Sequence, residues 1–306
     1  MVGSRSICGI IFFLDAGLQI MNVINEIRNA FNVHAHDYKR AAFVQHEIGL
    51  RLLARLDYML LDPRYILDLG CGPGIFSQSL KQRYPNAQII GLDFALEMLS
   101  VAKESSGASE QLLVNADMHA LPIADMQFDL IFANQALHWT SSWDFLLREL
   151  YRVLAPGGCL MFTTLGPDTF MELRYAFSLA DQHAHVNDFM DLHNIGDALL
   201  AQGYTDPVVD MEMLTVHYPT LSQLLHSLKD QGVRHINRKR NPGLTGRNAW
   251  QRFSTAMNTL QTADAQYPLS YEVVYGHAWK SGEYEQKNGT ETTISMEQMK
   301  RLLSNQ

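Results

Sequence analysis

The stretch Tyr65-Ile-Leu-Asp-Leu-Gly-Cys-Gly-Pro-Gly74 leads from a short apolar run into a cluster of three glycines. Residues 65–69 have the pattern of a buried strand, and residues 76–84 have that of a helix. A glycine-rich turn between a parallel strand and its helix lets a ligand approach backbone N–H groups at the helix N-terminus. The sequence therefore predicts a strand, turn and helix unit with a ligand site at the turn.

Strand and helix patterns alternate on the C-terminal side of this unit. Further strands are expected at 88–93, 111–115, 128–133, 159–164, 208–218 and 271–279. Helices are expected at 97–102, 143–154, 168–181, 195–202, 221–229 and 249–260, and one or two more at 22–59. This alternation predicts an α/β fold, in which seven strands form a doubly wound, mainly parallel, Rossmann-like sheet.

Composition excludes several classes of protein. The chain has 306 residues, 47% hydrophobic and 18% charged, which predicts a soluble globular protein rather than a disordered one. Its net charge of -8 disfavours nucleic-acid binding by overall charge. Three scattered cysteines, Cys8, Cys71 and Cys159, predict neither a disulfide framework nor a metal site, and a cytoplasmic protein is expected. The apolar run at 7–14 is too short to span a membrane.

The ligand at the turn is expected to carry an adenosine group. Asp93 ends the second predicted strand about 20 residues after the turn, where an acidic residue accepts hydrogen bonds from ribose hydroxyls. A dinucleotide fingerprint would have its third glycine at position 75, but the sequence has Ile75 there. The glycines at 70, 72 and 74 therefore favour another adenosine-bearing cofactor.

Four segments together resemble the class I S-adenosylmethionine-dependent methyltransferases. They are Asp68-Leu-Gly-Cys-Gly-Pro-Gly74, Asp93, Asn115-Ala-Asp117 and Leu154-Ala-Pro-Gly-Gly158. The resemblance implies that S-adenosylmethionine is the cofactor. Its binding residues would be Asp68, Gly70, Gly72 and Gly74 at the turn, Asp93 at the ribose, Asp117 and Met118 at the adenine ring, and Asn134 after the fourth strand.

A narrower resemblance covers roughly residues 22–280. Residues 31–45, 134–139, 166–174, 244–247 and 271–279 are similar to those of the malonyl-acyl-carrier-protein O-methyltransferases of early biotin synthesis. Such enzymes methylate the free carboxylate of a malonyl thioester. An amphipathic pattern opens at Met21, so residues 1–20 are expected to be a mis-assigned start or a frayed extension. The resemblance implies a helical lid at 21–63. The methyltransferase domain would cover 64–280, with acceptor-site insertions at 166–192 and 220–266, before a polar tail at 281–306.

The acceptor chemistry requires capture of a carboxylate and no general base, because a carboxylate is already a nucleophile at neutral pH. Arginine suits this task because its planar guanidinium matches a carboxylate. Arg174, in the insertion after the fifth strand, is the leading candidate. Tyr38, on the lid, is a second candidate donor, and His138 with Trp139 is expected to form a wall of the acceptor site.

A basic segment stands out in this acidic chain, and it contains Arg234, Arg238, Lys239, Arg240 and Arg247. One interpretation is a docking site for an acidic acyl carrier protein, and the other is a solvated loop. RNA binding is disfavoured because no aromatic residues are interleaved.

Other functions remain open at this point. Residues 168–174 also resemble respiratory-complex assembly factors of the same fold that hydroxylate a protein arginine, and a cofactor-binding scaffold is a further alternative. A monomer is expected. The sequence does not decide between a carrier-protein and a coenzyme A thioester.

Overall fold

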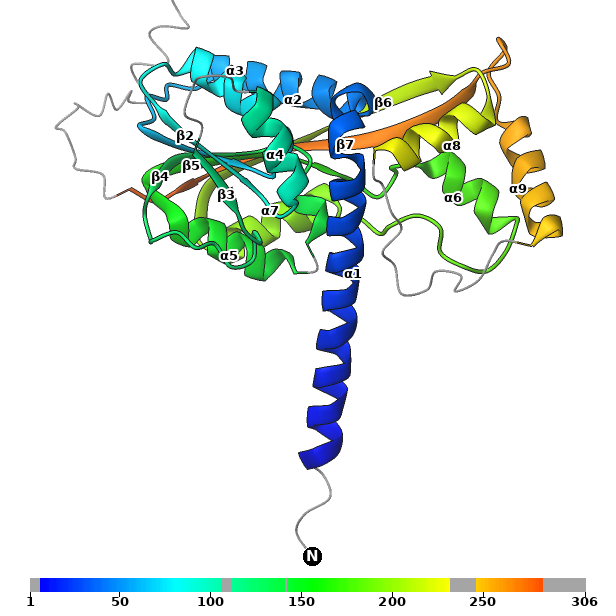
Figure 1. The fold of residues 1–306 in the computed structure, drawn as a ribbon, viewed down its shortest axis with the longest axis horizontal. Helices are drawn as coiled ribbons and strands as arrows, with labels where there is room; N and C mark the ends of the chain where they lie inside the picture. The colour runs from blue at the N-terminus through cyan, green and yellow to red at the C-terminus, as the bar shows by residue number, and fades with distance from the viewer. Residues whose placement is uncertain (1–5, 106–111, 141, 232–245, 283–306) are drawn as a thin grey trace, which may run out of the picture.

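The computed structural model describes residues 6–105, 112–140, 142–231 and 246–282, with side chains described from residue 24 onward. The chain begins with the long helix α1, Ser6–Ala41, followed by α2, Phe43–Arg55, and a 3-10 turn, η1, Leu56–Tyr58. The N-terminal half of α1 projects away from the body of the molecule (Figure 1). Helix α1 continues through Met21 without a break. The division of the chain into an extension and a lid at residue 20 stays a prediction. Within the described residues, no helix combines the length and hydropathy needed to cross a bilayer.

A single seven-stranded sheet forms the centre of the fold. Its strands are β1 Tyr65–Leu69, β2 Gln88–Asp93, β3 Leu112–Asn115, β4 Phe128–Ala133, β5 Leu154–Leu165, β6 Tyr204–Tyr218 and β7 Tyr267–Lys280. The order across the sheet is β3-β2-β1-β4-β5-β7-β6. Strands β1 to β5 pair in parallel, whereas β7 pairs antiparallel with both β5 and β6. The predicted doubly wound, mainly parallel sheet is confirmed.

Helices cover both faces of this sheet (Figure 1). The remaining helices are α3 Ile75–Arg83, α4 Leu96–Ser105, α5 Trp143–Val153, α6 Met171–Ser178, α7 Leu192–Ala201, α8 Leu221–Asp230 and α9 Arg247–Thr259, with a 3-10 turn, η2, at Leu137–Trp139. Successive residues of a strand point to opposite faces. Accordingly Leu130 packs with α2 and α3, while Ile131 packs in a separate cluster with α5 and α7. The central strands are apolar on both faces because both faces are covered.

Several predicted boundaries differ from the structure: β6 and β7 each begin four residues earlier than expected, α1 begins at Ser6 rather than residue 22, and the largest differences in form are in β5 and α6. The fifth strand was expected to begin at residue 159, but β5 begins at Leu154, directly where α5 ends. Leu154 pairs with Phe128, and regular pairing with β4 resumes only at Cys159, opposite Leu130. The Pro-Gly-Gly segment is therefore a bulge inside the strand rather than a turn before it. The helix expected at 168–181 is shorter, α6 at Met171–Ser178, because Phe170 adopts a left-handed conformation with φ 59°.

The sheet topology determines where a ligand can bind. Strand order reverses between β1 and β4, so the chain leaves the carboxyl ends of these neighbouring strands in opposite directions. In open α/β sheets this divergence opens a crevice at the carboxyl edge. The glycine turn after β1 and the segment after β4 both border that crevice.

Candidate functional site

The glycine turn is tied to the end of the neighbouring strand. The backbone N–H groups of Gly70 and Cys71 both donate to the carbonyl of Leu92, at 2.8 and 3.0 Å. Gly70, Gly72 and Gly74 have φ angles of 68°, 52° and 75°. Glycine adopts this left-handed region without the steric cost that a side chain adds, which explains the three alternating glycines. The turn thus presents its backbone at the edge of the crevice.

Asp93 holds the turn from the end of β2. One carboxylate oxygen accepts a hydrogen bond from Gly72 N at 2.9 Å, and the other accepts from Ala95 N at 2.8 Å. Burial raises the pKa of Asp93 to about 6, although hydrogen bonds from Ala95, Gly72 and Phe94 oppose that rise. The carboxylate is therefore fixed in position beside the glycine turn.

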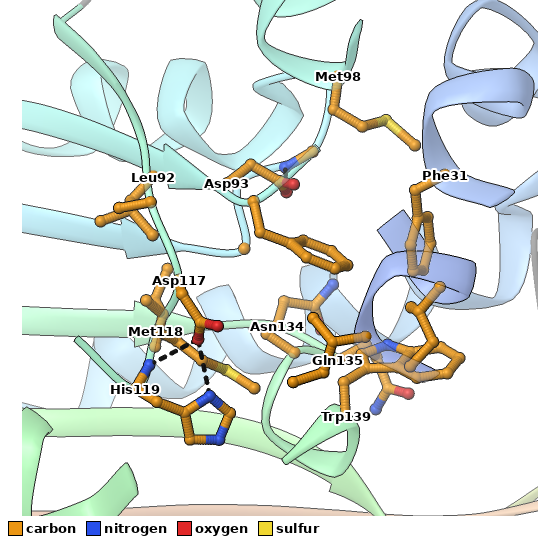
Figure 2. A pocket seen from close by; sticks show the side chains of 18 of the residues that line it. Phe31, Leu92, Asp93, Met98, Asp117, Met118, His119, Asn134, Gln135 and Trp139 are labelled. Atoms are coloured by element: carbon orange, nitrogen blue, oxygen red, sulfur yellow. Dashed lines mark hydrogen bonds and ion pairs between the residues drawn. The ribbon is translucent and has the colours of Figure 1, made fainter. Parts of the chain in front are cut away.

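A hollow with about 780 Å³ of space not filled by atoms opens over this edge of the sheet. Asp93, Asp117 and Met118 lie on one side of it, and Phe31 and Trp139 lie on the other (Figure 2). The residues that line it are Ile24, Ile27, Phe31, Tyr38, Leu69, Gly70, Gly72, Leu92, Asp93, Phe94, Met98, Ala116, Asp117, Met118, His119, Asn134, Gln135, Ala136 and Trp139. A mainly apolar hollow with a few convergent polar groups is typical of a cofactor site.

Asp117 is positioned by a histidine two residues later. Its carboxylate accepts hydrogen bonds from His119 N at 2.9 Å and from the His119 ring at 2.7 Å (Figure 2). The other ring nitrogen of His119 lies 2.7 Å from the hydroxyl of Thr140. The hydrogen bond from the imidazole is the main cause that lowers the pKa of Asp117. Asp117 therefore remains ionised at the edge of the hollow.

Not every predicted cofactor residue lines the hollow. Asp68 and Gly74 lie behind it: Asp68 is buried and accepts a hydrogen bond from Ser77 in α3 at 2.5 Å, and Gly74 precedes the first residue of α3. Asn134 does line the hollow, but its amide group is occupied. It donates to the carbonyl of Gln45 at 2.9 Å and accepts from the hydroxyl of Thr163 at 2.8 Å. These three residues are placed to support the site.

A second hollow, with about 510 Å³ of space not filled by atoms, adjoins the first. Phe31, Tyr38, Gln135 and Trp139 line both hollows, so this group forms the wall between them. Phe31 packs edge-on against Trp139, with ring centroids 5.5 Å apart. Burial and the nearby Asp93 carboxylate raise the pKa of Tyr38, so its hydroxyl stays protonated. The predicted lid tyrosine therefore lies at the junction of the two hollows.

Of the other two predicted acceptor residues, His138 lines the second hollow and Arg174 does not. Burial lowers the pKa of His138 to about 3, so its imidazole is neutral. Arg174 lines neither hollow. Its guanidinium donates to the backbone carbonyl of Asn187, a residue of the second hollow, and to that of Thr169, and it lies 3.7 Å from the carboxylate of Asp188. Direct contact of Arg174 with the acceptor carboxylate stays a prediction.

The basic segment is described only at its end. Arg247 is exposed and is the first residue of α9. Arg234, Arg238, Lys239 and Arg240 lie outside the described residues.

Several site residues were not assigned a function from the sequence. Gln135 lines both hollows in a left-handed conformation, with φ 54°, and its backbone N–H donates to Thr163 Oγ1 at 2.9 Å. His119 had a local signal, because it stands two residues after a candidate acid. Gln45 and Gln231 pair across 2.9 Å beside the second hollow, although 186 positions separate them. No local sequence pattern indicates a contact between residues so far apart in the sequence.

Comparisons with known proteins agree with this geometry. A family described as "Methyltransferase domain" matches residues 67–162, from β1 into β5. The YcgJ protein from Bacillus subtilis, a solved structure, superposes with a TM-score of 0.54 at 19% identity, covering 77% of this chain and 98% of that chain. That likeness shows the fold alone.

Two curated relatives match nearly the full length of the chain. The malonyl-[acyl-carrier protein] O-methyltransferase of Legionella pneumophila is 55% identical over 275 residues, which is 90% of this chain and 97% of the relative. That of Gallionella capsiferriformans is 41% identical, covering 86% of this chain and 93% of the relative.

Proposed function

The chain belongs to the family of malonyl-[acyl-carrier protein] O-methyltransferases, and from this premise we propose that it transfers a methyl group from S-adenosylmethionine to the free carboxylate of a malonyl thioester on an acyl carrier protein. The products are the malonyl methyl ester and S-adenosylhomocysteine. This reaction belongs to the early part of biotin synthesis. The observation that carries the proposal is the pair of adjoining hollows, one built on the glycine turn and one enclosed behind Tyr38.

The residues of the first hollow suit the cofactor. The Asp93 carboxylate, fixed beside Gly72, is placed to accept hydrogen bonds from ribose hydroxyls, and Met118 and Leu92 offer apolar contacts to an adenine ring. When bound, S-adenosylmethionine supplies an electrophilic methyl group on a sulfonium sulfur. Asp117 lies at the edge of the same hollow and would accept a hydrogen bond from the adenine amino group of a bound cofactor.

The protein contributes position rather than proton transfer. A carboxylate has an ordinary pKa near 4, so it is ionised and nucleophilic at neutral pH. Tyr38 and its aromatic neighbours form the boundary between the hollows, where acceptor and donor would meet in line and without intervening water. A neutral His138 is consistent with a reaction that requires no general base.

The carrier protein is proposed to dock beside the second hollow. Gln231 lines that hollow and precedes Arg234 by only three positions, so the basic segment follows the acceptor site directly in the chain. Acidic carrier proteins would be steered by such a group of positive charges. We further propose that the protein acts in the cytoplasm as a monomer.

Release of S-adenosylhomocysteine from matched thioesters tests the proposed reaction. Malonyl-carrier protein should give one equivalent per ester formed, whereas acetyl-carrier protein, which has no free carboxylate, should give none above background. Equal release from both would contradict carboxylate methylation. Cofactor binding without release from the malonyl thioester would instead favour the hydroxylase alternative.

Cofactor affinity should depend on pH through Asp93. Its pKa of about 6 in the folded protein means that the carboxyl becomes protonated, and loses strength as an acceptor, as the pH falls through 6. We therefore expect the dissociation constant of S-adenosylmethionine to be constant above pH 7 and to rise about tenfold per pH unit well below 6. Calorimetric titration from pH 8 to 5 measures this.

Two variants identify the titrating group. Asp93→Asn should bind S-adenosylmethionine weakly at every pH, and its dissociation constant should no longer rise as the pH falls below 6. Burial also raises the pKa of Asp68, to about 7. Asp68 bonds to Ser77 and does not line the hollow, so Asp68→Asn should keep the pH dependence of cofactor binding. A pH dependence that disappears in Asp68→Asn and persists in Asp93→Asn would refute this assignment.

A further inference from the structure

The second hollow contains an unusual concentration of unpaired polar atoms. In the described part of the chain, six buried side-chain nitrogen or oxygen atoms have no hydrogen-bond partner. Three of them, Tyr271 Oη, His138 Nδ1 and Gln45 Oε1, belong to residues that line this one hollow. Buried polar groups in native proteins are almost always paired, so an unpaired group needs an explanation, and a missing ligand is one. Their gathering here points to a ligand that supplies the partners.

Tyr271 is the clearest case. It belongs to β7, its side chain is almost completely buried, at 2% exposure, and its hydroxyl has two polar neighbours, Gln231 and Tyr218. Both are near enough to interact with it, but neither meets hydrogen-bond geometry with it, and each bonds to Ser227, Gln231 at 3.2 Å and Tyr218 at 2.7 Å. The Tyr271 hydroxyl is therefore buried beside the hollow without a hydrogen bond of good geometry.

The two unpaired donors share one chemical character. Burial raises the pKa of Tyr271 and lowers that of His138 to about 3, so both groups are neutral across the physiological range. Tyr271 can donate one hydrogen bond, and so can His138 in the tautomer with its proton on Nδ1, whereas no lysine or arginine among the described residues lines the hollow. Gln45 Oε1 is an acceptor and does not contribute to binding an anion. Two neutral donors in one hollow suit a small acceptor group, such as a carboxylate, held without a counter-charge.

Neutral donors also suit the chemistry better than an arginine clamp. A bidentate guanidinium engages both carboxylate oxygens and neutralises the charge that makes them nucleophilic. Separate neutral donors can orient the group while one oxygen keeps a lone pair directed toward the Tyr38 wall. Hydrogen bonds are also stronger in such a dry site than in water.

We propose that the second hollow binds the acceptor carboxylate, and that Tyr271 Oη and His138 Nδ1 are the hydrogen-bond donors that hold it. This assignment rests on the proposed function, because it names the residues that recognise its substrate. It replaces the arginine clamp expected at Arg174 with a neutral tyrosine and histidine pair.

Tyr271→Phe in the full chain tests the assignment. Because the hydroxyl makes no hydrogen bond of good geometry in the protein, its removal should change the melting temperature little. The kcat/KM for malonyl-carrier protein should fall about 10- to 100-fold, mainly through KM, since a hydrogen bond to a charged group is lost. The dissociation constant of S-adenosylmethionine should stay within about twofold of the parent value. His138→Phe should give a loss of the same order.

Tyr275→Phe is the matched control. Tyr275 lies four residues further along β7 and is also buried, but its hydroxyl bonds to Glu212 at 3.5 Å and it does not line the hollow. Its kcat/KM should equal that of the parent. A parent enzyme that methylates malonyl-carrier protein, together with a Tyr271→Phe variant of equal kcat/KM, would overturn this inference alone. A parent that binds the cofactor but does not methylate would overturn the proposed function instead.

Discussion

Gly72→Arg should abolish S-adenosylmethionine binding, with a loss of at least about 1000-fold, or ~4 kcal/mol. Gly72 lines the cofactor hollow, and the atom nearest to an added Cβ is Tyr38 Cε1 at 4.0 Å. The Cβ itself therefore fits, but the rest of an arginine side chain would extend into the hollow toward Asp93. Its cation would pair with the carboxylate that the ribose requires. Calorimetry with the purified variant measures the loss.

Gly72→Ala separates occlusion from backbone strain. Alanine at φ 52° carries the same left-handed strain, about 1–2 kcal/mol, without filling the hollow. It should lower the melting temperature and weaken cofactor binding by no more than about tenfold. If Gly72→Arg bound the cofactor as well as Gly72→Ala does, the cofactor would not occupy the hollow over the glycine turn.

Asp93→Ala should weaken cofactor binding at least about 100-fold. Each hydrogen bond to a charged group is worth about 1.5–3 kcal/mol, and the carboxylate is expected to hold ribose hydroxyls. The substitution also leaves the N–H groups of Gly72 and Ala95 without their acceptor, which loosens the glycine turn. Binding measured at pH 8, where the parent carboxylate is ionised, gives the full effect.

Asp129→Ala is the control for the structural part of that loss. The Asp129 carboxylate also accepts two backbone hydrogen bonds, from Arg64 N at 2.8 Å and Tyr65 N at 3.0 Å, but at the start of β1, the opposite end of the strand from the glycine turn. The Asp129→Ala substitution should lower the melting temperature without changing the affinity for S-adenosylmethionine. Equal losses of affinity in the two variants would mean that Asp93 acts only through stability.

The parts of the site that sequence predicts are those built from contiguous residues. The apolar strand before Gly70 and the three alternating glycines are local signals, and each strand pattern from 65 to 133 matches a strand within one residue. Asp93 is predictable because it ends the next strand, which topology places beside the first. The sheet order then brings these loops to one edge.

The acceptor side is less predictable because its contacts are long-range. Arg174 has the chemistry of a carboxylate clamp, but the fold places its guanidinium against the backbone carbonyls of Thr169 and Asn187 and near the protein's own carboxylate at Asp188. Tyr271 lies in an apolar strand, where its hydroxyl gives no sequence signal. That the hydroxyl makes no hydrogen bond of good geometry emerges only when β7, the C-terminal end of α8 and the first turns of α2 meet around the second hollow.

The most direct test of the central claim is mass spectrometry of malonyl-carrier protein after incubation with the purified protein and S-adenosylmethionine. The account predicts a gain of one methyl group on the carrier protein, located on the malonyl group by fragmentation. The gain should require the cofactor and be lost with Gly72→Arg. A carrier protein of unchanged mass, incubated with a protein that demonstrably binds S-adenosylmethionine, would contradict the account.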